Sequence, residues 1–211
     1  MAEIIPAILT DSFEDAQQKV RSVAPVVRWV QLDVSDGIFT PNATWGEPEQ
    51  VRELGNVRVE AHLMVEKPEE ILPLWLTSGV GRIFIHYEAT QEHERCITMI
   101  KEAGIEAGIA LLPQTSADVV APFAQTLDAV LVFSGSLGSY GGVFNGDDTL
   151  SKISTLRRHY PDLTIEVDGG MNPESARAVV EAGADAIVSG GFIFGNKNPQ
   201  EAIEELEGAT K

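Results

Sequence analysis

The sequence predicts an α/β protein of the (β/α)8 barrel class, the TIM barrel, and three observations lead to this fold class. Short apolar segments alternate with amphipathic helical segments along the whole chain. The apolar segments are largely continuous, as in parallel strands that are covered on both faces. Eight such strand–helix units favour a closed barrel over an open doubly wound sheet. We expect one barrel domain spanning residues 1–211.

The expected strands are short apolar runs that end on a polar residue, a glycine or a loop. They are Ile4–Leu9, Trp29–Asp33, Arg58–Met64, Arg82–His86, Glu106–Leu111, Ala129–Phe133, Thr164–Val167 and Ala186–Ser189. Between and after them, the spacing of apolar residues predicts helices. These are Phe13–Val23, Pro48–Leu54, Pro68–Thr77, His93–Ala103, Ser116–Gln125, Thr149–His159, Pro173–Glu181 and Pro199–Leu206.

Residues at the helix ends agree with this assignment. Asn172-Pro173 and Asn198-Pro199 each place an N-cap residue before a proline at the first helical position. Gly79, Gly104 and Gly183 follow helical segments, where glycine can adopt the left-handed C-cap conformation.

Composition excludes several classes of function. The formal net charge of −17 argues against nucleic-acid binding, because a phosphate backbone requires a basic surface. We expect no signal peptide and no membrane span, and therefore a cytoplasmic protein. Cys96, the single cysteine, excludes an internal disulfide, and we expect it to be buried on a helix. His93 and His159 fall on predicted helices, and we expect both at the surface.

Three strands end on residues that can move protons or bind a metal. Asp33, His62 and Asp168 each follow an apolar run. Because active sites of barrels lie at the carboxyl ends of the strands, we expect these three side chains to converge.

A series of motifs then resembles the ribulose-phosphate 3-epimerase family, in order over nearly the whole chain. The resemblance implies a barrel in which Asp33 and Asp168 exchange the proton at C3 of a ketose 5-phosphate through an enediolate. It implies a divalent metal, zinc, manganese or iron, at Asp33, His62 and Asp168. The motifs are Pro6-Ala-Ile-Leu-Thr10, Leu32-Asp-Val-Ser-Asp-Gly37, Phe39-Thr-Pro-Asn42, His62-Leu-Met64, Ile85-His86-Tyr-Glu88, Glu166-Val-Asp-Gly-Gly-Met-Asn-Pro173, Ala182-Gly-Ala-Asp185 and Ile193-Phe-Gly195.

The departures from the family pattern concentrate at the same site. Gln31 replaces a metal-binding histidine, and neutral amide oxygen binds zinc less well than imidazole does. We therefore expect metal binding to be weakened or absent. Gln31 is either a further ligand or a hydrogen-bond donor to the enediolate. Ser35 replaces a methionine, and the segment 133–143 lacks the proline, glutamine and methionine of the family.

The resemblance also implies contacts with a phosphorylated sugar and assembly as a homo-oligomer. It places Thr10, His62 and Met64 against the substrate and gives His86 a supporting role. Backbone amides of glycine-rich loops would bind the phosphate. The matching residues are Ser139, Tyr140, Gly141, Gly142, Gly169, Gly170, Gly190 and Gly191.

Three functions follow from these observations. The first is a sugar-phosphate epimerase that interconverts D-ribulose 5-phosphate and D-xylulose 5-phosphate or a close relative. The second is a related enediolate-forming lyase, which is disfavoured because Asp33-Val-Ser-Asp36 lacks the lysine of the Asp-x-Lys-x-x-Asp pattern. The third is a catalytically altered or inactive barrel that binds a phosphorylated ligand.

Overall fold

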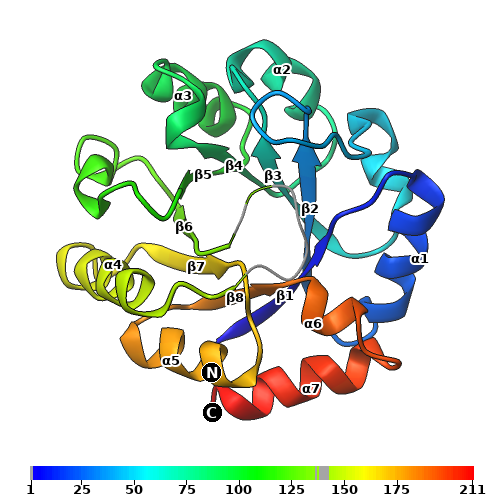
Figure 1. Ribbon diagram of the computed structural model, residues 1–211. Coiled ribbons are helices and arrows are strands. Elements are labelled where there is room, and N and C mark those ends of the chain that lie inside the picture. The colour runs from blue at the N-terminus through cyan, green and yellow to red at the C-terminus, as the bar shows by residue number, and fades with distance from the viewer. Residues whose placement is uncertain (1, 136, 138–142) are drawn as a thin grey trace.

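The structure, a computed structural model, describes residues 2–135, 137 and 143–211, and its eight strands form one closed barrel (Figure 1). Neighbouring strands pair in chain order and in parallel, and the last strand closes on the first. The expected barrel class is confirmed. The strands are β1 (Glu3–Ile8), β2 (Trp29–Ser35), β3 (Arg58–Met64), β4 (Arg82–His86), β5 (Glu106–Leu111), β6 (Ala129–Phe133), β7 (Thr164–Asp168) and β8 (Ala186–Ser189).

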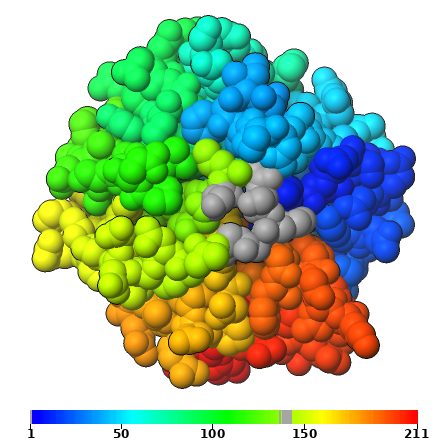
Figure 2. Space-filling model, viewed as in Figure 1, coloured from blue at the N-terminus to red at the C-terminus, as the bar shows by residue number. Residues whose placement is uncertain are grey.

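Helices surround the barrel and follow one another around it in chain order (Figures 1 and 2). The α-helices are α1 (Phe13–Val23), α2 (Pro68–Trp75), α3 (His93–Glu102), α4 (Gly146–His159), α5 (Pro173–Ala182), α6 (Gly191–Phe194) and α7 (Pro199–Ala209). The short α6 was not predicted. Three segments of the described chain form 3-10 helices, which are η1 (Pro48–Glu53), η2 (Tyr87–Ala89) and η3 (Ala117–Val120).

Two of the expected α-helices, Pro48–Leu54 and Ser116–Gln125, are therefore 3-10 helices. Short segments favour this tighter geometry. The first is followed by Gly55, whose positive φ of 139° ends the helix. The second reaches Pro122, which lacks the N–H that a continuing helix requires.

The expected helix ends are confirmed where the structure tests them. The side chain of Asn172 accepts hydrogen bonds from the backbone of Glu174 and Ser175, and Ser175 donates back to complete a capping box. Gly79, Gly104 and Gly183 all have positive φ, of 96°, 75° and 117°. Asn172 therefore fixes where α5 begins, and the three glycines follow the ends of α2, α3 and α5.

Two predictions about single side chains had different outcomes. Cys96 is fully buried on α3, as expected. His93, which we expected at the surface, is instead buried, because its Nε2 lies 2.7 Å from the carbonyl oxygen of Tyr87 and its ring stacks on that residue. Among the described residues, no helix is long and apolar enough to cross a membrane.

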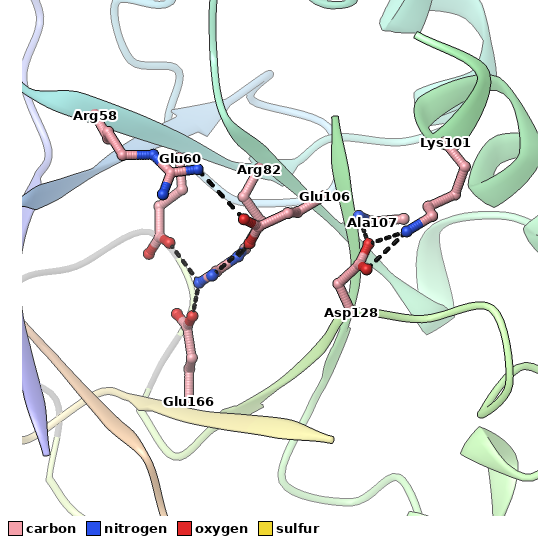
Figure 3. A network of polar contacts seen from close by, with 8 residues as sticks. All are labelled: Arg58, Glu60, Arg82, Lys101, Glu106, Ala107, Asp128 and Glu166. Carbon is pink, nitrogen blue, oxygen red and sulfur yellow. Dashed lines mark hydrogen bonds and ion pairs between the residues drawn. The ribbon is translucent and has the colours of Figure 1, made fainter. Parts of the chain in front are cut away.

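A network of charged side chains lies inside the barrel, which the sequence analysis did not predict (Figure 3). The guanidinium of Arg82 on β4 contacts Glu60 on β3 at 3.1 Å and also pairs with Glu166 on β7. Its Nη2 lies 2.6 Å from Glu106 on β5. Because β4 and β7 are not neighbours in the barrel, this contact crosses the barrel interior. Trp29 covers the network, with its ring 4.8 Å from the Cζ of Arg82.

Candidate active site

Two buried carboxylates meet around one amide at the ends of β2 and β7. The Nε2 of Gln31 donates to Oδ1 of Asp33 at 2.7 Å and to Oδ2 of Asp168 at 2.8 Å. Gln31 and Asp33 are neighbours on one face of β2, since strand side chains alternate. One amide group therefore holds together carboxylates that are far apart in the sequence.

The imidazole of His62 completes the cluster from β3. Its Nδ1 lies 3.3 Å from Oδ1 of Asp33, 3.6 Å from Oδ2 of Asp168 and 3.4 Å from Nε2 of Gln31. The ring is fully buried. The register of the barrel aligns Asp33 with His62 on the neighbouring strand.

Burial and charge act in opposite directions on these groups. Burial raises the pKa of Asp33, and the negative charge of Asp168 adds to this, while His62 and Gln31 oppose it. For His62, burial alone would lower the pKa, but its contacts with Asp168 and Asp33 outweigh burial and raise the pKa to about 9. The imidazole thus tends to be positively charged where two carboxylates meet.

A second histidine continues the cluster away from the carboxylates. The Nε2 of His86 on β4 lies 2.8 Å from Nε2 of His62, and Nδ1 of His86 lies 3.4 Å from Oε2 of Glu88. Burial lowers the pKa of His86 to about 4, helped by the charge of His62 and opposed by the contact with Glu88. In the sequence, His86 appeared only as a supporting residue.

A cavity of about 290 Å³ opens above the carboxylates. Asp33 and Asp168 line it, as do five of the residues that the resemblance to the family places against substrate or phosphate. These are Met64, Gly169, Gly170, Gly190 and Gly191. The other lining residues were not predicted to contact a ligand; they are Ala7, Leu9, Phe133, Gly135, Met171, Asn172, Val188, Ser189 and Phe192. Most of them are apolar, so in the sequence they look the same as ordinary core residues.

Gly169 shows why glycine is required in one wall of the cavity. Its φ is 104°, and a Cβ atom there would lie 2.3 Å from the backbone nitrogen of Gly135. The backbone N–H of Ser134 donates to the carbonyl of Asp168 at 2.7 Å, which ties the end of β6 to the end of β7. The close approach of these two backbones leaves no room for a side chain.

Other candidate residues do not line the cavity. The hydroxyl of Thr10 donates to Oδ2 of Asp15 at 2.6 Å and accepts from the backbone of Ser12, so it serves the start of α1. His62 lies beneath the carboxylates and does not line the cavity. Four candidates for phosphate binding, Ser139, Tyr140, Gly141 and Gly142, lie outside the described residues.

The cluster has the donor atoms that a divalent metal needs. Ligand atoms of Asp33, His62 and Asp168 lie within 4.8 Å of one another, and all three residues are buried. Oε1 of Gln31 is a buried acceptor without a hydrogen-bond partner among the described residues. Rotating the amide by half a turn would exchange its nitrogen and oxygen and direct this oxygen at the same point. The residues therefore fit a metal, although the mixed set contains only one imidazole.

Comparison with known proteins identifies the family. The family model described as "Ribulose-phosphate 3 epimerase family" matches residues 3–194. The chain belongs to the ribulose-phosphate 3-epimerase family. It is 36% identical over 216 residues to the ribulose-phosphate 3-epimerase of Schizosaccharomyces pombe, covering 99% of this chain and 94% of the relative. It is 34% identical over 217 residues to that of Bacillus subtilis, covering 99% and 100%.

Solved structures of other proteins share the fold of this epimerase-family chain. One is KGPDC from Streptococcus mutans, with a TM-score of 0.79, 14% identity and coverage of 100% of this chain and 97% of the other. Another is a 3-hexulose-6-phosphate synthase, with a TM-score of 0.72, 17% identity and coverage of 100% and 99%. At such identities the likeness concerns the barrel alone. Membership of the family supports the class of isomerases and epimerases that act on phosphorylated sugars.

Proposed function

We propose that this protein is a sugar-phosphate epimerase that interconverts D-ribulose 5-phosphate and D-xylulose 5-phosphate, or a closely related pair of ketose phosphates. The observation that carries the proposal is the pair of carboxylates of Asp33 and Asp168, held by one amide at the floor of a cavity. Inversion at a carbon needs one proton carrier for each face of the substrate.

In this mechanism one aspartate removes the proton at C3 and the other, already protonated, delivers a proton to the opposite face. Burial and mutual repulsion favour a pair that carries one proton, because two adjacent buried carboxylates resist simultaneous ionisation. The N–H groups of Gln31 and the imidazolium of His62 stabilise the ionised carboxylate.

A divalent metal, if bound, would be held by Asp33, His62 and Asp168, with Oε1 of Gln31 as a fourth ligand. When bound, zinc, manganese or iron would supply positive charge that stabilises the enediolate oxygens. Gln31 is therefore given two alternative roles, one for each orientation of its amide.

Backbone amides hold the phosphate at the other side of the cavity in this proposal. Gly169, Gly170, Gly190 and Gly191 line the cavity and let a phosphate approach the main chain without side-chain charge. This explains how a chain with a net charge of −17 would accept an anionic substrate. The cytoplasmic location and the homo-oligomer stay predictions.

The test is proton NMR of ribulose 5-phosphate in D2O with purified protein, with and without added zinc or manganese. We expect deuterium to enter at C3 while xylulose 5-phosphate forms. Absence of exchange under every metal condition would refute the epimerase proposal. If the sugar phosphate still raises the melting temperature, the protein is a barrel that binds a phosphorylated ligand without turnover.

A further inference from the structure

His62 uses its two ring nitrogens for different purposes. Its Nδ1 faces Asp33 and Asp168, whereas its Nε2 lies 2.8 Å from Nε2 of His86. Both imidazoles are fully buried. Between two nitrogens at this distance only one can donate, so the protonation of one ring fixes the role of the other.

The contact between His86 and Glu88 determines which of the two histidines is the hydrogen-bond donor. Nδ1 of His86 lies 3.4 Å from Oε2 of Glu88. Both atoms are buried and lack a hydrogen bond among the described residues, which leaves each as the available partner of the other. A carboxylate only accepts, so this contact places the proton of His86 on Nδ1. Nε2 of His86 is then an acceptor, and His62 must keep a proton on its own Nε2.

Glu88 is in turn held from its other side. Its Oε1 accepts from the backbone N–H of Leu112 at 3.0 Å and from the hydroxyl of Thr115. Both groups are donors to Oε1, so Oε2 remains as the oxygen that faces His86. The ring of His86 is also confined by Phe39, whose centroid lies 5.0 Å away.

We propose that Glu88, acting through His86, keeps a proton on Nε2 of His62 and thereby directs Nδ1 at the two aspartates. His86 and Glu88 are then positioning residues. This inference rests on the proposed function, because Nδ1 is the atom through which His62 would contact the carboxylates or bind a metal. Partners of this kind orient ligand histidines in metal sites generally.

The substitution Glu88→Gln tests the proposal because it reverses the order of donors without changing the shape of the side chain. Leu112 and Thr115 both donate, so the amide oxygen of the variant takes the place of Oε1 and its NH2 group faces His86. Nδ1 of His86 then becomes an acceptor, and its proton moves to Nε2. Nε2 of His62 would then have to accept, so His62 would lose its imidazolium form and keep a proton only on Nδ1, toward the site.

Nitrogen-15 NMR of the histidine side chains reads these tautomers directly, and the chain has only four histidines to assign. We expect His86 to be protonated on Nδ1 in the wild type and on Nε2 in Glu88→Gln. Titration with zinc or manganese should show an affinity about 10–100-fold lower in the variant. The two readouts separate positioning from a general loss of structure.

Two control variants accompany this experiment. Glu94→Gln removes the same charge from an exposed position on α3 and should leave the tautomers and the metal affinity unchanged. Thr115→Val removes one donor but keeps the carboxylate of Glu88, so the proton should stay on Nδ1 of His86.

The proposal is overturned if wild-type His86 carries its proton on Nε2, a result that needs no variant. It is also overturned if Glu88→Gln leaves the tautomer of His86 as in the wild type. These outcomes are distinct from failure of the proposed function. A wild type without deuterium exchange at C3, but with the tautomer reversed in Glu88→Gln, would refute the epimerase and support the positioning chain.

Discussion

Two polar clusters lie inside the same barrel at different levels, and β3 and β7 contribute to both. Glu60 and Glu166 stand two residues before His62 and Asp168, on β3 and β7. The deeper cluster contains a permanent cation, Arg82, and none of its members lines the cavity. The upper cluster has two carboxylates, an imidazole and an amide, and it opens to the cavity.

The partners of the carboxyl groups distinguish the deeper cluster, which is structural, from the upper cluster, which can take part in chemistry. A guanidinium stays charged at every relevant pH and gives the surrounding carboxyl groups a fixed partner. The upper carboxylates contact Gln31 and the titratable His62 and line the cavity, so a substrate or a metal could reach them.

The largest effect should come from removing a proton carrier in the upper cluster. Asp168→Asn keeps the shape and an oxygen acceptor for Gln31 but cannot carry a proton. We expect turnover of ribulose 5-phosphate to fall by up to about 10⁴-fold. NMR in D2O measures the rate, and thermal stabilisation by the sugar phosphate should persist. Asp162→Asn, on the exposed surface, serves as the control; turnover retained in Asp168→Asn would remove this residue from the mechanism.

In the deeper cluster, Arg82→Met should mainly reduce stability. It leaves Glu60 and Glu166 buried without their cation, which typically costs about 3–5 kcal/mol in the free energy of unfolding. Urea denaturation at neutral pH measures this. Arg58→Met is the matched control, because Arg58 is largely exposed and its ion pair with Glu106 should contribute about 1 kcal/mol or less. Equal effects of the two substitutions would contradict our view of Arg82 as the necessary cation.

The pH dependence of stability sharpens the comparison further. Burial raises the pKa of Glu60 from 4.5 to about 8, outweighing Arg82. Between these values the unfolded chain releases the proton and the folded chain keeps it. The contribution of Glu60 to stability is therefore full below pH 4.5 and is lost as the pH rises toward 8.

Glu60→Gln should remove this dependence. From pH 6 to pH 7.5, the stability of the wild type relative to the variant should fall by about 2 kcal/mol, at about 1.4 kcal/mol per pH unit. Urea denaturation at the two pH values checks the change. A constant difference between wild type and variant would mean that Glu60 is ionised in the folded protein across this range.

The smallest effect concerns metal binding by the upper cluster. Gln31→His replaces the amide with an imidazole beside Asp33, His62 and Asp168, so zinc affinity should rise by about 10-fold, measured by calorimetric titration. Gln91→His adds a histidine at an exposed position and should not change the zinc affinity of the site. No gain in Gln31→His would show that residue 31 does not contribute to a metal site.

Much of the barrel was predictable because its signals are local. All eight strands appear within a residue or two of their expected bounds, since each is a short apolar run closed by a polar residue or glycine. The helix type was wrong only for the short segments near Pro48 and Ser116, because apolar periodicity does not distinguish a 3-10 helix from an α-helix. Polar residues at strand ends also indicated where Asp33, His62 and Asp168 would meet.

The sequence by itself determined the fold class and the identity of the groups at the carboxyl ends of the strands. The contacts of these polar groups, in contrast, became known only from the tertiary structure. It turned the hydroxyl of Thr10 toward Asp15, placed Arg82 between carboxylates from distant strands, and connected Glu88 to His62 through His86. The physical reason is that strand formation depends on neighbouring residues, whereas buried polar groups must find partners across the barrel. Those partners are set by the register and closure of the sheet.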